Sequence, residues 1–227
     1  MSDAIPILYL GNKNYSSWSL RPWLCLRWAG IEFEERLISL KQEGYGRGEI
    51  AEVLDVSPAG KVPALHVGSS KIWDSLAIAE WAAEQEPELW PQDPAVRAEA
   101  RSVVCEMHSG FPDLRDQLPM NIERRCRASN LRPGTYRDIR RVLAVWDTLR
   151  SKYAAHGPWL FGRRTIADAF YAPIVTRFRT YGIEVPQSAA DYASTLLDDA
   201  DFRVWEAQPI PERFEFIDEV FGHGGAD

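Results

Sequence analysis

The chain has 227 residues, 45% of them apolar and 26% charged, a composition typical of a globular protein that is long enough for two domains. Its net charge of −7 argues against a general nucleic-acid-binding protein, because neutralising phosphates requires an excess of basic residues. No stretch approaches the roughly 20 apolar residues that span a bilayer, so we expect neither a membrane segment nor a nucleic-acid partner.

The first 85 residues alternate between strand and helix signals. In chain order they predict a buried strand at 5–10, a helix over 20–30, a half-buried strand at 31–39, a short helix within 49–58, two strands at 62–68 and 71–74, and a helix over 75–85. The helix over 20–30 is expected to end at Gly30, a residue that favours the helix C-terminus. The order β-α-β-α-β-β-α describes an α/β domain.

Prolines interrupt the pattern in "EPELWPQDP", so we place a domain boundary there and assign residues 1–86 and 94–227 to two domains. The second domain is expected to be all helical, with helices over 97–118, 137–153 and 165–182. We expect the first of these to bend at Gly110-Phe111-Pro112 and the last to kink at Pro173. The ending "GHGGAD" is expected to fray.

Thr165 and Asp168 open the predicted helix over 165–182 as a variant capping box, with aspartate in place of the usual glutamate. Both are interpreted as structural residues rather than catalytic ones.

The cysteines Cys25, Cys105 and Cys126 are far apart and odd in number, and no C-x-x-C pair occurs. This pattern argues against a disulfide framework or a zinc site and favours a reducing compartment. The N-terminal "MSDAIPILYL" lacks the basic segment of a signal peptide, and its apolar run is too short for one. We therefore expect a cytoplasmic protein without a bound metal.

Three serines lie between the first strand and the first helix, in "NYSSWSLRPW" at residues 14–23. Pro22 has no N–H and fits best among the first residues of a helix, which predicts Ser19 or a later residue as the N-cap. Ser16 and Ser17 would then lie just upstream, where a hydroxyl could meet a ligand. The alternative is that the turn only caps the helix.

Four features considered together resemble the cytosolic glutathione transferases: this serine turn, "SPAGKVPAL", "DSLAIAEW" and "TIAD". The turn "SSWSLR" is most similar to the zeta class, which has S-S-C-S-x-R. The resemblance covers essentially the whole chain. It implies a thioredoxin-like N-terminal domain, an all-helical C-terminal domain, a homodimer, and glutathione as co-substrate with no metal.

The resemblance also implies a set of glutathione-binding residues. Ser16, or Ser17 beside it, would donate a hydrogen bond to the glutathione thiolate and lower its pKa. The Val62-Pro63 peptide would be cis and would pair with the cysteinyl part of glutathione. Lys61 would meet the glycine carboxylate, while Ser75, as a helix cap, and Asp74 would bind the γ-glutamyl carboxylate and ammonium. The alternatives are a trans proline, an exposed lysine and a cap without a ligand.

The chain departs from the zeta pattern at two positions. Trp18 stands where that class has a cysteine associated with isomerase activity, and Thr180 stands where it has an arginine associated with the substrate carboxylate. Arg177 and Arg179 would project at other angles. No cysteine lies in the serine turn itself, and Cys25 is expected to be buried in the following helix.

A pocket for the second substrate is expected between the domains. Its candidate residues, chosen by position, are Arg21, His108, Phe111, Arg115 and Met120. The sequence thus predicts transfer of glutathione to a small, largely apolar electrophile. The alternatives are a glutathione-dependent cis-trans isomerase similar to maleylacetoacetate isomerase, and a binding or scaffold protein of the same fold without catalysis.

Overall fold

A computed structural model describes residues 5–221 of the chain, so the predicted frayed ending at 222–227 lies outside the described residues. The strands are β1 (Ile7–Leu10), β2 (Glu34–Leu37), β3 (Ala64–Val67) and β4 (Ser70–Trp73), and they form one sheet in the order β2-β1-β3-β4. β1 pairs with β2 in parallel and with β3 in antiparallel, and β3 and β4 form an antiparallel hairpin.

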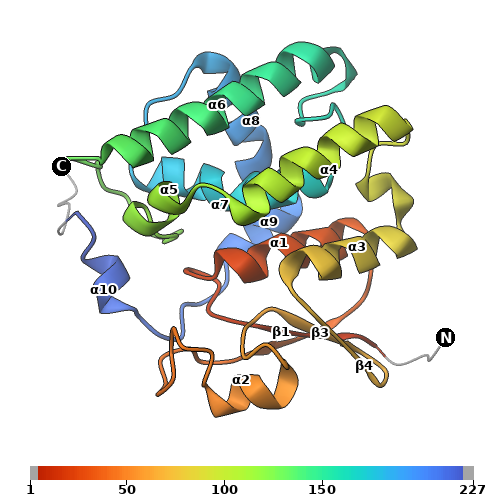
Figure 1. Ribbon diagram of the computed structural model, residues 1–227, viewed down its shortest axis with the longest axis vertical. Coiled ribbons are helices and arrows are strands. Elements are labelled where there is room, and N and C mark those ends of the chain that lie inside the picture. The colour runs from red at the N-terminus through yellow and green to blue at the C-terminus, as the bar shows by residue number, and fades with distance from the viewer. Residues whose placement is uncertain (1–4, 222–227) are drawn as a thin grey trace.

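Three helices accompany this sheet, namely α1 (Ser17–Trp28), α2 (Ala51–Val56) and α3 (Ser75–Gln85). Figure 1 shows α1 and α3 on one face of the sheet and α2 on the opposite face. The predicted β-α-β-α-β-β-α order is therefore confirmed. The β1–α1–β2 unit joins two parallel strands through a helix, which explains why the serine turn lies at the carboxyl end of β1.

The predicted half-buried strand at 31–39 is confirmed in part: the strand is shorter, and Ile31 and Phe33 just before it are half-buried. All four residues of β2 are exposed, whereas Ile38 just beyond the strand is buried. β2 lies at the edge of the sheet, and its glutamate-rich outer face has no partner strand among the described residues. Charged residues on an edge strand discourage pairing with another chain.

The prediction that Ser19 caps the first helix is wrong. α1 begins at Ser17, and Ser16 is its N-cap: the Ser16 hydroxyl accepts a hydrogen bond from the backbone N–H of Ser19 at 3.3 Å. Pro22 lies inside the helix and leaves one backbone carbonyl without its helical donor. Burial of α1 offsets this cost, because side chains such as Trp23 and Leu24 each contribute about 2 kcal/mol when buried.

The rest of the chain is helical, as predicted. It contains η1 (Pro87–Leu89), α4 (Pro94–Ser109), α5 (Pro112–Gln117), α6 (Pro133–Tyr153), η2 (Ala154–His156), α7 (Ile166–Thr180), α8 (Gln187–Leu197), α9 (Ala200–Glu206) and α10 (Glu215–Asp218). The predicted bent helix over 97–118 is instead two helices. Phe111 adopts a left-handed conformation with φ of 61°, which ends α4 and allows α5 to begin at Pro112.

Helix α7 lies at the centre of the helical domain and packs against α1, α4 and α8. The predicted capping box at its start is present, with the Thr165 N–H donating to Asp168 Oδ2 at 2.8 Å. A second Asp168 oxygen accepts from the Leu160 N–H at 3.0 Å. Contact between α1 and α7 joins the two halves of the chain through one continuous apolar core.

The segment after α9 returns from the helical domain toward the sheet, as Figure 1 shows for α10. The contacts that hold it there include a hydrogen bond from Asn12 Nδ2 to the Glu212 carbonyl at 2.9 Å, one from Tyr15 to Asp218 at 2.8 Å, and an ion pair between Lys41 and Glu215 at 2.7 Å. This segment therefore reaches the same end of β1 as the serine turn.

Candidate active site

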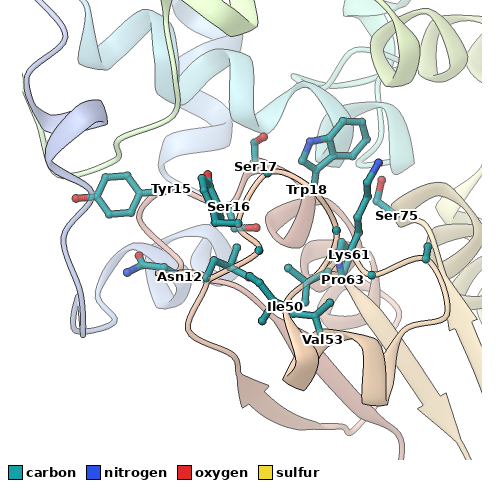
Figure 2. Close-up of a pocket in the computed structure, with 18 of the residues that line it drawn as sticks. Asn12, Tyr15, Ser16, Ser17, Trp18, Ile50, Val53, Lys61, Pro63 and Ser75 are labelled. Carbon is teal, nitrogen blue, oxygen red and sulfur yellow. The ribbon is translucent and has the colours of Figure 1, made fainter. Parts of the chain in front are cut away.

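A cavity of about 600 Å³ opens where β1 ends and α1 begins. Its wall is formed by the serine turn, the glycine-rich loop at 44–48, the segment 59–63, the start of α3, and Phe214 with Ile217 from the C-terminal segment. Figure 2 shows the labelled part of this wall, with Ser16 and Ser17 on one side and Pro63 and Ser75 on the other. The volume is in the range of sites for small molecules.

Ser16 and Ser17 both line the cavity, but their hydroxyls differ in their partners. The Ser16 hydroxyl is half-buried and lies 2.8 Å from the Ser19 hydroxyl, which also accepts from the Gly11 N–H. The Ser17 hydroxyl makes no hydrogen bond with any residue between 5 and 221, although Ser17 is buried. Either hydroxyl is available to a ligand, because the Ser16–Ser19 pair can reverse its donor and acceptor.

The Val62-Pro63 peptide is cis, as the resemblance predicted, and both residues line the cavity. Lys61 lines it as well and is exposed. In Figure 2 the Lys61 side chain extends from beside Pro63 in the direction of Trp18 and Ser75. A positive charge is therefore present on the side of the cavity where α3 begins.

Asp74 and Ser75 meet the cavity at the N-terminus of α3, where the helix dipole favours an anion. The prediction that Ser75 caps this helix is wrong, because Asp74 is the N-cap and accepts from the Leu76 N–H at 2.8 Å. Asp74 holds φ of 75°, a strained conformation for a residue with a side chain. The Ser75 hydroxyl is buried and has no hydrogen-bond partner within the described chain.

None of the residues predicted for the second-substrate pocket is part of the cavity wall. Arg21, His108 and Arg115 lie instead behind Trp18, whose indole is on the wall and 40% exposed. The Arg21 and Arg115 guanidinium carbons are 4.5 Å and 5.3 Å from the centroid of the Trp18 ring. Phe111 and Met120 are buried in the core and also lie outside the cavity wall.

His108 joins this group through Asp74. Its Nε2 lies 3.4 Å from an Asp74 carboxylate oxygen, and its ring meets the edge of Trp18 with centroids 5.3 Å apart. Burial lowers the pKa of His108, against the opposing effect of Asp74, and so favours the neutral imidazole. Its Nδ1 is buried without a partner among the described residues.

Sequence reasoning missed the parts of the wall that come from distant segments. Tyr15, Tyr45 and Phe214 form an aromatic group, with Phe214 5.2 Å from Tyr15 and 5.5 Å from Tyr45 between ring centroids. The glycine-rich "GYGRG" at 44–48 was a visible signal for a close backbone approach. No local signal connected the C-terminal "RFEFIDEVF" with the serine turn, about 200 residues earlier.

The described residues contain no group of three or more His, Cys, Asp or Glu side chains that could hold a metal ion. Nor does any helix in this part of the chain combine the length and apolarity needed to cross a membrane.

Two protein-family models match the chain. The model for the N-terminal domain of glutathione S-transferases matches residues 15–85, and the model for the C-terminal domain matches residues 107–208. Together they cover most of the sequence and divide it into the same two halves as the sheet and the helices.

Similar curated proteins are mainly named maleylacetoacetate isomerase. The probable enzyme of Caenorhabditis elegans is 33% identical over 50% of this chain and 51% of its own length. The Rattus norvegicus enzyme is 28% identical over 82% of this chain and 83% of its own length. Glutathione S-transferase 1 of Dianthus caryophyllus is 27% identical over 79% of this chain and 80% of its own length. The chain spans about half the length of the first relatives it matches, from the nematode and from Drosophila melanogaster.

Solved structures show the same fold at low sequence identity. A glutathione transferase homologue from Burkholderia with bound glutathione is 22% identical, with a TM-score of 0.67 over 89% of this chain and 96% of that chain. A diazinon-metabolising glutathione S-transferase from Bombyx mori is 17% identical, with a TM-score of 0.69 over 89% of this chain and 97% of that chain.

Proposed function

Because this chain belongs to the glutathione S-transferase family, we propose that it binds glutathione in the cavity beside the serine turn and transfers its sulfur to a small electrophile. The observation that carries the proposal is the buried hydroxyl of Ser75, a residue that lines the cavity at a helix N-terminus and whose hydroxyl has no hydrogen-bond partner in the described chain. A buried hydroxyl is ordinarily paired. The γ-glutamyl carboxylate of glutathione would supply the missing acceptor.

The other glutathione contacts follow from this placement. The cis Val62-Pro63 peptide would pair with the cysteinyl backbone, Lys61 would attract the glycine carboxylate, and Asp74 would accept from the γ-glutamyl ammonium. With the peptide held in this way, its sulfur would lie next to the serine turn. No metal or organic prosthetic group takes part in this reaction.

The serine turn would hold glutathione as the thiolate. A thiol with a pKa near 8.5 is only a few per cent ionised at pH 7, and a hydrogen bond to the sulfur favours the charged form. If Ser19 donates to Ser16, the Ser16 hydroxyl can donate to the sulfur, and the short pair strengthens this donation. The thiol proton leaves to solvent, and the thiolate then forms a carbon–sulfur bond with the electrophile.

The test compares Ser16→Ala and Ser17→Ala in a glutathione-conjugation assay, together with the pH dependence of the rate. The catalytic hydroxyl is the one whose loss lowers kcat by about 10- to 100-fold and moves the thiol ionisation to higher pH, as expected for a hydrogen bond to a charged group. Two fully active single variants would exclude both serines. Failure of the protein to bind glutathione on an immobilised column would reject the transferase function and favour a binding or scaffold protein.

Glutathione-dependent cis-trans isomerisation is the second candidate function, because curated relatives of this chain carry the name maleylacetoacetate isomerase. Isomerisation also starts from attack by the thiolate, but it ends with elimination of glutathione. Trp18 stands where the zeta pattern has its cysteine, which favours conjugation over isomerisation here. Turnover of a cis-enediolate diacid at catalytic glutathione concentrations would favour isomerisation over conjugation as the function.

A further inference from the structure

Arg21 is the most unusual side chain next to the cavity. It is completely buried on α1, and its Nε, Nη1 and Nη2 all lack a hydrogen-bond partner in the described chain. A guanidinium has five N–H donors and is charged at any ordinary pH. Burying it without an acceptor costs free energy, so its position calls for a ligand that the protein itself does not provide.

The surroundings of Arg21 hold the cation in place but do not neutralise it. The guanidinium lies between the rings of Trp18 and Phe170, with its central carbon 4.5 Å and 5.1 Å from their centroids. Such stacking favours a cation but supplies no hydrogen-bond acceptor. Burial, followed by the positive charges of Arg115 and Arg177, lowers the pKa of Arg21, and only Asp74 acts in the opposite direction.

The two neighbouring arginines differ from Arg21 in having backbone acceptors. Arg115 donates to the carbonyls of Met107 and Gly110, and Arg177 donates to those of Leu118 and Pro173. Asp74 is committed to the Leu76 N–H and lies near His108. The group behind Trp18 therefore has an excess of positive charge, and the donors of Arg21 are free within the described chain.

We propose that Arg21, with the positive charge of Arg115 beside it, forms a carboxylate-binding subsite behind Trp18, and that the Trp18 indole must move aside for a carboxylate on the electrophilic co-substrate to reach it. The inference rests on the proposed function for the source of that carboxylate. It narrows the expected co-substrate to an electrophile that carries a carboxylate as well as an apolar body.

Trp18 is suited to the role of a cover. Its indole is on the cavity wall, directly follows Ser17, and contacts Arg21, Arg115 and His108 on its inner side. Because the ring is 40% exposed, its displacement toward solvent uncovers Arg21 without opening the core. A carboxylate arriving there would be held next to the serine turn, and thus beside the attacking sulfur.

The test uses ethacrynate and its methyl ester, which share one enone and differ in a carboxylate remote from it. The thiolate adds to the terminal carbon of the enone, the electron pair moves to the ketone oxygen, and the resulting enolate takes a proton from solvent. Rates are measured with excess glutathione and corrected for the uncatalysed reaction. Binding is measured separately by calorimetry without glutathione, using the saturated analogues dihydroethacrynate and its methyl ester, which cannot alkylate a thiol.

Arg21→Met removes the charge and the N–H donors and keeps an unbranched side chain that can stay packed in the core. We expect it to lower kcat/KM for ethacrynate and the affinity for dihydroethacrynate by about 10- to 100-fold, as for one charge-assisted hydrogen bond. The ester values and the KM for glutathione should not change. Arg101→Met is the matched control, because Arg101 is an exposed arginine whose guanidinium lies over Trp90.

Trp18→Ala provides a second variant if Arg21→Met does not fold. It uncovers Arg21, so the preference for acid over ester should increase. Equal losses for acid and ester in either variant would overturn the subsite, and so would a rise in the glutathione KM in Arg21→Met, which would assign Arg21 to a carboxylate of glutathione. If neither compound is conjugated but dihydroethacrynate binds through Arg21, the subsite stands and the transferase function fails. If the ester is conjugated and the acid has no advantage over it, the transferase function stands and the carboxylate subsite fails.

Discussion

Replacing Ser75 with alanine separates ligand binding from stability more cleanly than any other single change at the cavity. The Ser75 hydroxyl is buried without a partner in the described chain, so the unliganded protein loses no hydrogen bond when it is removed. Removing an unpaired polar group relieves a desolvation cost. The free energy of unfolding should therefore be unchanged or rise by up to about 1 kcal/mol, equivalent to about 2–4 °C in Tm for a chain of this length.

The affinity for glutathione should move in the opposite direction. A hydroxyl that donates to the γ-glutamyl carboxylate contributes about 1.5–3 kcal/mol, because the acceptor is charged. Ser75→Ala should thus raise the Kd by about 10- to 100-fold. Calorimetric titration of glutathione gives the Kd, and thermal unfolding without glutathione gives the stability of the same preparation.

Ser57→Ala is the matched control for this experiment. The Ser57 hydroxyl is also buried and unpaired within the described residues, but Ser57 is not part of the cavity wall. Its removal should affect stability as Ser75→Ala does and leave the Kd for glutathione unchanged. The reasoning fails if Ser75→Ala binds glutathione as tightly as the natural protein, or if the two substitutions weaken binding equally.

Three further predictions concern the fold. Gly60→Ala should lower the free energy of unfolding by about 3 kcal/mol, because φ is +63° and the added Cβ would lie 2.1 Å from a facing carbonyl oxygen. Gly46→Ala, where φ is +78° but no atom lies within 4 Å of the added Cβ, should lower it by only about 1 kcal/mol in the same thermal melts. Burial raises the pKa of Asp168 to about 6, so its contribution to unfolding free energy is full below about pH 4 and is lost, by about 3 kcal/mol, as the pH rises through 6. Burial also raises the pKa of the Cys25 thiol, so a polar thiol reagent should label exposed Cys105 in the native protein and Cys25 only after unfolding.

Each of these predictions has a result that contradicts it. Equal melting temperatures for the two glycine variants would show that the close contact at Gly60 is relaxed at little cost. For Asp168, the free energy of unfolding in urea is measured from pH 4 to pH 7 for the natural protein and for Asp168→Asn, which cannot titrate. If the natural protein gained stability relative to the variant as the pH rises, the predicted pH dependence would have the wrong sign. Rapid labelling of Cys25 in the native state would show that α1 opens readily.

The elements of the fold could be read from local patterns, and the caps could be read only in part. Thr165 and Asp168 are three residues apart and form the predicted box, because a capping box is a purely local arrangement. The prediction of Ser19 as the N-cap failed because Pro22 was treated by its local cost alone. Packing of α1 against α3 and α7 outweighs that cost and allows the helix to begin three residues earlier.

The cavity was less accessible to sequence reasoning than the fold. The resemblance identified residues 61–63 and 74–75, which the structure brings together with the serine turn. It could not show that Ser75 lacks a partner or that Arg21 is buried, because both facts depend on side chains from other elements. By sequence, Arg21 could equally be a solvated helix residue, whereas in the structure it is buried beside the rings of Trp18 and Phe170.

The C-terminal segment that supplies Phe214 and Ile217 to the cavity wall makes order in that segment and occupancy of the cavity thermodynamically linked. A ligand that touches these side chains binds more tightly when the segment is docked, and by reciprocity it stabilises the docked state by the same factor. Amide hydrogens at 212–218 should therefore exchange more slowly in the presence of glutathione. The far end of the chain would then report on an event at the end of its first strand.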